Sequence, residues 1–365
     1  MAYDGRGPAA TCVNLLSGMV DEGLRCSVHL DRKRAPIAGV PSVAAVPSPL
    51  SFISYQFIRR LASRRSERRY LGSLAEGDVA YLWPAASLET HQTVFARGNP
   101  IVLEGINTRM KAAREVLDEA YGLLGAEPTH GITDQRIEEE DEKLALASYF
   151  FAPSKGVEDA LVGSPLDPSR IISASYGTSL SYFQPGSAGP GSERCRILFV
   201  GSVCVRKGAH LLLEAWDQLD LNAELILAGG VEDVIEERCA HQLARDDVRV
   251  CGHVGDVRSL YQEADVFVVP SLEEGDPLVT YEAAASGLPI IATPMGATRM
   301  GQKEGCVRMV DRSDPASLAE AIHQLASSPD ERSSWADRAA QAVQNYDWTT
   351  VGRSRAQQLT GRVAE

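Results

Sequence analysis

Residues 196–219 read RILFVGSVCVRKGAHLLLEAWDQL, and this stretch decides the fold. It begins with a short apolar run that ends in glycine. After a glycine-bounded loop it continues with apolar residues at helical spacing. A buried strand, a tight turn and a helix in that order make up most of a βαβ unit. The stretch therefore predicts a parallel sheet with helices packed on it.

Five further apolar runs continue this pattern toward the carboxyl end, and helical segments alternate with them. They occupy residues 223–230, 248–252, 265–271, 288–294 and 306–310. Short strands that alternate with helices, at about 25 residues per unit, are typical of βαβ units in a parallel sheet. The second half of the chain is therefore predicted to be a doubly wound domain.

The first half shows a similar pattern less regularly. A helical segment at 10–23 precedes a strand at 25–30, and later apolar runs occupy 79–84, 99–105, 148–154 and 170–177. We expect a first domain of residues 1–186, a second of residues 187–343, and a final helix within 344–365 that packs back on the first domain. The Gly-, Ser- and Pro-rich segment 179–195 is the best linker between them. Two such halves form a cleft, and ligands bind there outside the carboxyl ends of the strands.

The composition is that of a globular protein, with 365 residues, 44% of them hydrophobic and 23% charged. The net charge of −13 argues against nucleic acid as a partner, because phosphates would be repelled over most of the surface. The seven cysteines form no CxxC pair, which predicts buried, reduced thiols in a cytoplasmic protein. No apolar run is long enough to span a membrane, and the chain does not begin with a secretory signal.

Residues 4–10, DGRGPAA, resemble the glycine-rich turn that follows a first strand, but only three residues precede them. Either the first strand is rudimentary or the sequence begins inside it. Gly5, Gly7 and Ala10, with Asp31 about twenty residues later, match the spacing of a dinucleotide fingerprint. Since the strand that should precede this turn is missing, a nicotinamide site and a plain turn at the cleft are the two alternatives.

Arg206 and Lys207 lie in a glycine-bounded loop between a predicted strand and a predicted helix. Cations at the start of a helix are disfavoured by the helix dipole, so helix stability does not explain them. In a chain of net charge −13 they indicate a site for an anion such as a pyrophosphate. The alternative is a pair of solvated charges.

The stretch EGDPLVTYE at 274–282 places two glutamates eight positions apart. Pro277 suits the first position of a helix and Asp276 suits the N-cap before it, so Glu274 is expected in the preceding loop, facing the cleft. Glu282 is then expected within the helix, roughly 7–8 Å further along its axis. Carboxylates so placed can bind hydroxyls at the two ends of a sugar nucleotide. The alternative is two ordinary helix glutamates.

These segments together resemble the retaining glycosyltransferases of family 4, which have the GT-B fold. The resemblance rests on GSVCVRKGAHLLLEAW, VRVCGHV, YQEADVFVVPSLEEGDPLVTYEAAASGLPIIATP and SYGTSLSYFQP, and it is weak before residue 140. It implies an α/β protein with two Rossmann-like, doubly wound domains that face each other across a cleft. It also implies sugar transfer from a nucleoside diphosphate donor, with retention and without a metal or cofactor. The acceptor would be a glycan, a lipid-linked molecule or a small molecule held mainly by the first half.

The resemblance also implies roles for individual residues. The family's Glu-x7-Glu motif corresponds to Glu274 and Glu282, which would bind hydroxyls of the donor sugar and the ribose. Arg206 and Lys207 match the basic pair that holds the diphosphate, so Arg206, Lys207 and Glu274 are the catalytic candidates. The other donor-binding candidates are Gly201, Ser202, His253, Val254, Gly275, Asp276, Leu278 and Val279. The acceptor-side candidates are Gly5, Arg6, Gly7, Glu104 and Asn107.

Three positions depart from the family pattern. Asp276 stands where phenylalanine is usual, Gly177-Thr178-Ser179 replaces Gly-Val-Asp, and the histidine after the 99–105 strand is absent. Two alternatives to an active transferase therefore stay open. One is a catalytically silent sugar-nucleotide-binding protein, and the other is an NAD(P)-dependent dehydrogenase that uses residues 5–10.

Two charged segments complete the predictions. Residues 57–70, FIRRLASRRSERRY, carry six arginines and one glutamate, with Phe57, Ile58 and Leu61 on an apolar side. This pattern predicts either a basic helix that docks peripherally on an anionic membrane or acceptor, or a plain solvated helix. The acidic run EEEDE at 138–142 is expected to be a helix surface rather than a metal site, since no histidine or cysteine accompanies it.

Overall fold

The computed structural model describes residues 2–3, 7–46, 55–186 and 194–363, with the backbone alone described at 55–57. The second half contains one six-stranded parallel sheet in the order β10-β9-β8-β11-β12-β13. Its strands are β8 (Cys195–Val200), β9 (Ala223–Ala228), β10 (Val248–Val250), β11 (Val266–Val269), β12 (Ile290–Ala292) and β13 (Arg308–Met309). Counted from β8, this is the order 3-2-1-4-5-6 of a Rossmann sheet. The predicted doubly wound fold is confirmed.

The first half contains two smaller parallel sheets. One joins β1 (Ala2–Tyr3), β2 (Val28–Lys33) and β3 (Ser42–Val46), and the other joins β4 (Ala80–Leu82), β5 (Ile101–Glu104), β6 (Tyr149–Ala152) and β7 (Ile171–Ser173). The first strand is a two-residue one, in which Ala2 and Tyr3 pair with Arg32 and Lys33. The strand β3 was not predicted, because prolines at 41 and 47 flank a short run of small residues.

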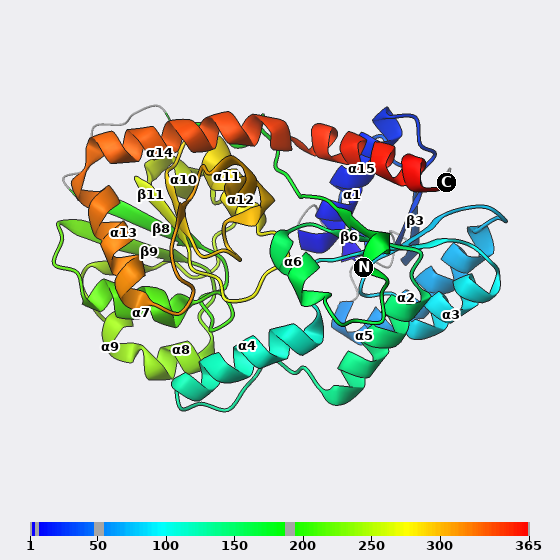
Figure 1. Ribbon diagram of the computed structural model, residues 1–365, viewed down its shortest axis with the longest axis horizontal. Coiled ribbons are helices and arrows are strands. Elements are labelled where there is room, and N and C mark those ends of the chain that lie inside the picture. Colours follow the sequence, from blue (N-terminus) through cyan, green and yellow to red (C-terminus); the bar gives the residue numbers. More distant parts are fainter. Residues whose placement is uncertain (1, 4–6, 47–54, 187–193, 364–365) are drawn as a thin grey trace.

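Helices connect the strands in both halves (Figure 1). The first half has α1 (Gly7–Asp21), α2 (Tyr55–Ser73), α3 (Leu88–Ala96), α4 (Met110–Leu123), α5 (Asp134–Leu146) and α6 (Lys155–Ala160). The second half has α7 (Ala209–Asp217), α8 (Asp233–Arg238), α9 (Ala240–Leu243), α10 (Arg258–Glu263), α11 (Leu278–Ala285), α12 (Thr298–Glu304), α13 (Pro315–Ser327) and α14 (Pro329–Ala342), followed by α15 (Trp348–Val363). Within the described ranges, no helix combines the length and apolar character needed to cross a bilayer.

The six-stranded sheet of the second half is buried on both faces. Successive residues of a strand point to opposite sides, and here both sets are packed in the core. Ile197 and Phe199 pack with α7 and α13 on one side, whereas Leu198 packs in the cluster on the other side. Two residues of α4, Leu117 and Tyr121, belong to the same cluster as α7. A helix of the first half therefore packs directly on the second half.

Of the seven cysteines, Cys12, Cys239 and Cys306 are buried, so the prediction of buried thiols is confirmed for three and wrong for the others, which are partly exposed.

The chain returns to the first half at its carboxyl end. In Figure 1, α14 runs along one side of the molecule and α15 then lies beside α1. The two helices approach so closely that a Cβ added at Gly18 would lie 2.8 Å from the Cα of Gly352. Glycines at both positions make this backbone contact sterically feasible.

A buried ion pair joins α15 to the middle of the first half. Arg355 is 1% exposed, and its Nη1 lies 2.6 Å from Oε2 of Glu104 at the end of β5. Its Nη2 donates to the carbonyl oxygen of Ser175 at 2.9 Å, and its guanidinium lies over the ring of Phe151. The hydroxyl of Tyr81 also donates to Glu104. Glu104, a predicted acceptor-side residue, is thus held by structural partners.

We predict that Arg355→Ala lowers the free energy of unfolding by roughly 3–5 kcal/mol, because it leaves the Glu104 carboxylate buried without its counter-charge. Chemical denaturation of the purified protein measures this change. The control is Arg353→Ala on the same helix, which removes a half-exposed pair with Glu22 and should cost about 0–1 kcal/mol. Equal effects of the two substitutions would show that the buried pair does not hold α15 in place.

Candidate active site

The predicted site residues of the second half gather where β8 and β11 end. These two strands are neighbours in the sheet, and the order of the chain reverses between them. The loop after β8 carries Gly201, Ser202, Arg206 and Lys207, and the loop after β11 carries residues 273–276. In open parallel sheets this reversal is where ligands bind.

Glu274 and the two cations form one ion cluster. The Lys207 ammonium pairs with Oε1 of Glu274, and Nη1 of Arg206 lies 3.3 Å from Oε2. Burial by itself would raise the pKa of Glu274, but the charges of Lys207 and Arg206 bring it below its usual value. Glu274 is therefore an ionised carboxylate, and it fixes both cations at the carboxyl edge of the sheet.

The position of Lys207 also depends on the next residue, Gly208. Its φ is +69°, and a Cβ at this position would lie 1.9 Å from the carbonyl oxygen of Pro270. Only glycine lets the loop after β8 lie this close to the segment that follows β11. The tight contact places the cations beside Glu274.

The remaining donor-side candidates lie near the same edge. Glu282, on α11, accepts a hydrogen bond of 2.9 Å from the hydroxyl of Tyr261, and burial raises its pKa to about 7. Leu278 and Val279 form the first turn of α11 and are partly exposed. His253 is exposed and Val254 partly buried in the loop after β10. The two motif glutamates thus lie on either side of the start of α11.

The loop of residues 273–276 is also bound to the first half. The carboxylate of Glu273 accepts hydrogen bonds from the backbone NH of Thr108 at 2.9 Å and from its hydroxyl at 2.8 Å. The side-chain amide of Asn107 donates to Glu273 at 3.3 Å. Gly275 packs on the carbonyl oxygen of Ile106, where a Cβ would be only 2.2 Å away. The predicted acceptor-side residue Asn107 therefore lies next to the loop that carries Glu274.

The prediction that Asp276 caps α11 is wrong. Pro277 occupies the N-cap position, and no side chain caps the helix. Oδ2 of Asp276 accepts from the backbone NH of Tyr176 at 2.6 Å and from the hydroxyl of Tyr281 at 2.8 Å. Its other oxygen accepts from the backbone NH of Arg299 at 3.3 Å. Burial raises the pKa of Asp276 to about 7, although these three donors favour its ionised form.

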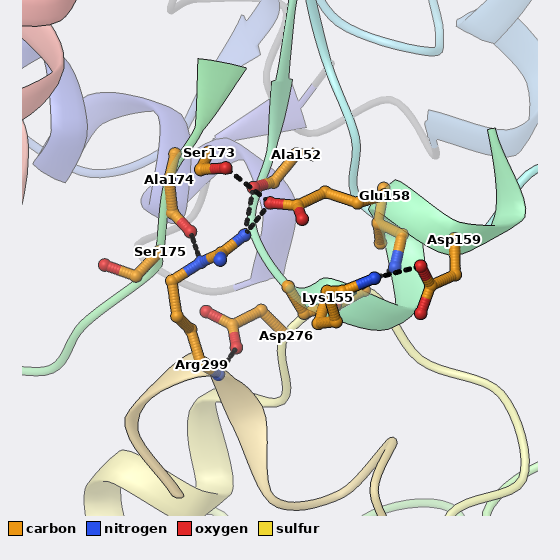
Figure 2. Close-up of polar contacts among 12 residues, drawn as sticks. Ala152, Lys155, Glu158, Asp159, Ser173, Ala174, Ser175, Asp276 and Arg299 are labelled. Atoms are coloured by element: carbon orange, nitrogen blue, oxygen red, sulfur yellow. Dashed lines mark hydrogen bonds and ion pairs between the residues drawn. The ribbon is translucent and has the colours of Figure 1, made fainter. Parts of the chain in front are cut away.

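Arg299 extends this contact between the two halves. Figure 2 shows its guanidinium beside the ends of β6 and β7. It donates to the carbonyl oxygens of Ala152, at 3.0 Å, and of Ala174, and it pairs with Glu158 at 2.5 Å. Asp276 and Arg299 thus attach the start of α11 to the first half.

The other acceptor-side candidates are placed as follows. Gly5 and Arg6 lie outside the described residues, and Gly7 begins α1 with a φ of +63°.

Asp31, the acidic residue of the dinucleotide fingerprint, is buried and accepts a hydrogen bond of 2.8 Å from the Ser63 hydroxyl. A nicotinamide cofactor would need this carboxylate for its ribose, but the side chain is 4% exposed. Within the described ranges, no group of three histidine, cysteine, aspartate or glutamate side chains is placed to hold a metal ion.

The acidic run at 138–142 lies on a helix, with Glu138 and Glu142 exposed as predicted, but Glu140 and Asp141 make contacts that a plain surface would not. On α5, Glu140 accepts a hydrogen bond of 2.7 Å from the backbone NH of Met110, and Asp141 binds Arg109 through two hydrogen bonds.

Sequence reasoning also missed Glu273 and Arg299. Their partners in the first half lie more than a hundred residues away, and the only local signal was the doubled glutamate at 273–274.

Sequence comparison matches part of the chain. The family model for group 1 glycosyl transferases matches residues 194–328. A D-inositol 3-phosphate glycosyltransferase of Corynebacterium urealyticum is 30% identical over 223 residues, which are 54% of this chain and 52% of that protein. An MMP alpha-(1->4)-mannosyltransferase of Mycolicibacterium hassiacum is 29% identical, over 54% of this chain and 50% of that protein. The chain spans about half the length of the curated relatives it matches.

Structural comparison extends over the whole chain. Sucrose-phosphate synthase from Thermosynechococcus elongatus has a TM-score of 0.74 at 18% identity, and the match covers 100% of this chain and 95% of that one. Anabaena HepE in complex with UDP and glucose has a TM-score of 0.67 at 15% identity, with 98% and 97% covered. At these identities the match establishes the fold. The second half thus matches the group 1 glycosyl transferases over residues 194–328, and the chain as a whole has the GT-B fold.

Proposed function

We propose that the protein transfers a sugar from a nucleoside diphosphate sugar to a hydroxyl of an acceptor bound mainly by the first half. The observation that carries this proposal is the meeting of Arg206, Lys207 and the start of α11 at the edge of a Rossmann sheet. UDP is the nucleotide in the Anabaena HepE complex, so UDP-sugars are the first donors to test.

In this proposal the donor lies along the edge of the six-stranded sheet where its strands have their carboxyl ends. The diphosphate binds beside Lys207 and Arg206, near Gly201 and the backbone amides of Leu278 and Val279. Backbone amides at a helix start favour a negative charge. The ribose hydroxyls bind Glu282, and the base lies by the loop that contains His253 and Val254.

The chemistry follows from where charge develops. When the bond between sugar and diphosphate breaks, negative charge grows on the departing phosphate oxygen. Preorganised cations there stabilise the transition state more than they stabilise the bound donor. Glu274 holds Lys207 and Arg206 in position before the donor arrives, and it would also accept hydrogen bonds from the donor sugar.

Contacts of Asp276 and Asp31 bear on the two alternatives to an active transferase, which are a silent sugar-nucleotide-binding protein and a dehydrogenase. A silent binding protein was suggested partly by Asp276, whose charge would oppose a diphosphate at the start of α11. Its carboxylate instead faces Tyr176, Tyr281 and the backbone of Arg299, which compensate that charge. This favours an active enzyme. The dehydrogenase alternative loses support because Asp31 is buried and binds the Ser63 hydroxyl.

The helix α2 adds a peripheral contact to the proposal. Its arginines 59, 60, 64, 65, 68 and 69 are all exposed, while Ala62 and Ser66 face inward. Leu61, expected on an apolar side, is 71% exposed among these arginines. We propose that this face contacts an anionic membrane surface, because clustered arginines beside an exposed leucine suit an interfacial helix.

We predict that Lys207→Ala lowers kcat by about 10²–10³, with a smaller rise in donor KM, because the lost cation acts mainly on the transition state. Arg206→Ala should have an equal or smaller effect. Steady-state transfer from a UDP-sugar measures both constants. Lys303→Ala is the control, since Lys303 is an exposed lysine of the same half. A rise in KM with unchanged kcat would mean that the cations only anchor the donor.

Asp276→Ala is expected to raise the donor KM by about tenfold, or roughly 1.4 kcal/mol, because the loop before α11 loses its attachment to Tyr176. Unfolding should also become easier by roughly 1–3 kcal/mol for each buried donor left unpaired. Asp276→Asn keeps one acceptor oxygen and should be milder on both measures. Wild-type stability and KM in Asp276→Ala would contradict this role.

Replacement of Arg60, Arg64 and Arg68 by glutamine should reduce binding to anionic vesicles by at least tenfold, since each basic residue near such a surface contributes about 1 kcal/mol. Sedimentation with phosphatidylserine-containing vesicles measures this binding, and neutral vesicles are the control. Equal binding to both kinds of vesicle, or no effect of the substitutions, would leave α2 as a solvated helix.

A further inference from the structure

A cavity of about 690 Å³ lies on the first half and extends to the proposed transfer site. It is bounded by the ends of β4 and β5 and by α4 and α5, and it reaches Arg206 and Glu273 of the second half. Its size falls within the roughly 300–1,000 Å³ of small-molecule sites. If the proposed function holds, this cavity is where the acceptor binds, and its lining restricts the acceptor's chemistry.

Much of the wall is apolar. Leu82, Leu103, Leu144, Phe150 and Leu161 line the cavity and also belong to the hydrophobic core of the first half. Leu117 and Ile132 add to the wall on the side of α4. Such a surface favours a nonpolar group, since transferring it from water into the cavity is favourable in proportion to the area buried.

Three of the four cations that line the cavity pair with a carboxylate, and the fourth, Arg136, binds a carbonyl oxygen. Arg109 forms two hydrogen bonds with Asp141, at 2.9 and 2.6 Å, and Lys143 pairs with Glu139 at 2.7 Å. Arg136 donates to the carbonyl oxygen of Gly131 at 2.7 Å, and Arg206 pairs with Glu273 and Glu274.

The same lining contains five carboxylates, those of Glu104, Glu139, Glu140, Glu232 and Glu273. They outnumber the four cations. A phosphate group in this cavity would lie among carboxylates that outnumber the cations, so its loss of hydration would be poorly compensated.

The polar groups in the wall instead suit hydroxyls. The Nδ1 of His91 lies 2.8 Å from the carbonyl oxygen of Ser87, so Nδ1 carries the proton and Nε2 is a hydrogen-bond acceptor. Burial lowers the pKa of His91 to about 4, which keeps the ring neutral. Burial also raises the pKa of Glu140 to about 7. Neutral and weakly acidic groups of this kind exchange hydrogen bonds with a hydroxyl without requiring a charged ligand.

We propose that the acceptor is an uncharged, hydroxyl-bearing molecule with an apolar substituent that occupies this cavity, such as an alkyl glycoside. The inference rests on the proposed function. It separates this chain from the corynebacterial relatives, whose name gives D-inositol 3-phosphate, a phosphorylated molecule, as the substrate.

The test uses the full chain and three glucose derivatives: hexyl β-glucoside, methyl β-glucoside and glucose 6-phosphate. Calorimetric titration, with and without saturating UDP, should give a dissociation constant for hexyl β-glucoside at least tenfold lower than for methyl β-glucoside. Glucose 6-phosphate should bind more weakly than either. Tighter binding of glucose 6-phosphate than of methyl β-glucoside, or no binding of hexyl β-glucoside, would overturn the proposal.

A variant pair locates the binding. Ile132→Ala should weaken binding of hexyl β-glucoside by at least threefold and leave UDP binding unchanged. The control is Leu123→Ala, which removes an equally apolar side chain that is 81% exposed on α4. Equal effects of the two substitutions would place the hexyl group outside this cavity.

The same titrations separate this inference from the proposed function. If UDP, GDP and ADP all fail to bind, the transferase proposal fails whatever the glucosides do. If a nucleotide binds and glucose 6-phosphate is the preferred sugar, only the inference about the acceptor fails.

Discussion

The loop of residues 273–276 binds the two halves of the molecule together and also positions the proposed donor site. Glu273 holds the backbone of Thr108, Gly275 packs on Ile106, and Asp276 holds the backbone of Tyr176. Between them, Glu274 holds Lys207 and Arg206. The same loop therefore carries both the contacts between the halves and, through Glu274, the contacts that position the cations.

This arrangement explains how a chain of net charge −13 can offer a site to an anion. The cations at the sheet edge are fixed by a buried carboxylate rather than left in solvent, where salt would screen them. A diphosphate has to compete with Glu274 for them, but it finds them already oriented. Preorganisation of this kind lowers the cost of binding and acts most strongly where charge develops.

The regular part of the fold was predictable because strand and helix periods are local properties of the sequence. The six strands of the second half and the helix that begins at Leu278 follow from apolar runs and turn residues. The clustering of Arg206, Lys207 and Glu274 also followed, since loops at the carboxyl ends of adjacent parallel strands meet.

What sequence reasoning missed depends on contacts between distant segments. Asp276 has the local features of a helix cap, yet Tyr176 and Arg299 provide better partners and Pro277 takes the cap position. The acidic run on α5 looked like a surface because its partners, Arg109 and the backbone of Met110, lie on another helix. Glu104 has no local feature that indicates its pairing with Arg355, about 250 residues later in the chain.

The most direct test of this account is a crystal structure of the full chain with whichever of UDP, GDP and ADP binds. We expect the diphosphate within hydrogen-bonding distance of Lys207 and the first turn of α11, and the ribose hydroxyls on Glu282. A nucleotide bound to the glycine-rich turn at residues 5–10, with the cluster of Glu274 and Lys207 unchanged, would contradict it.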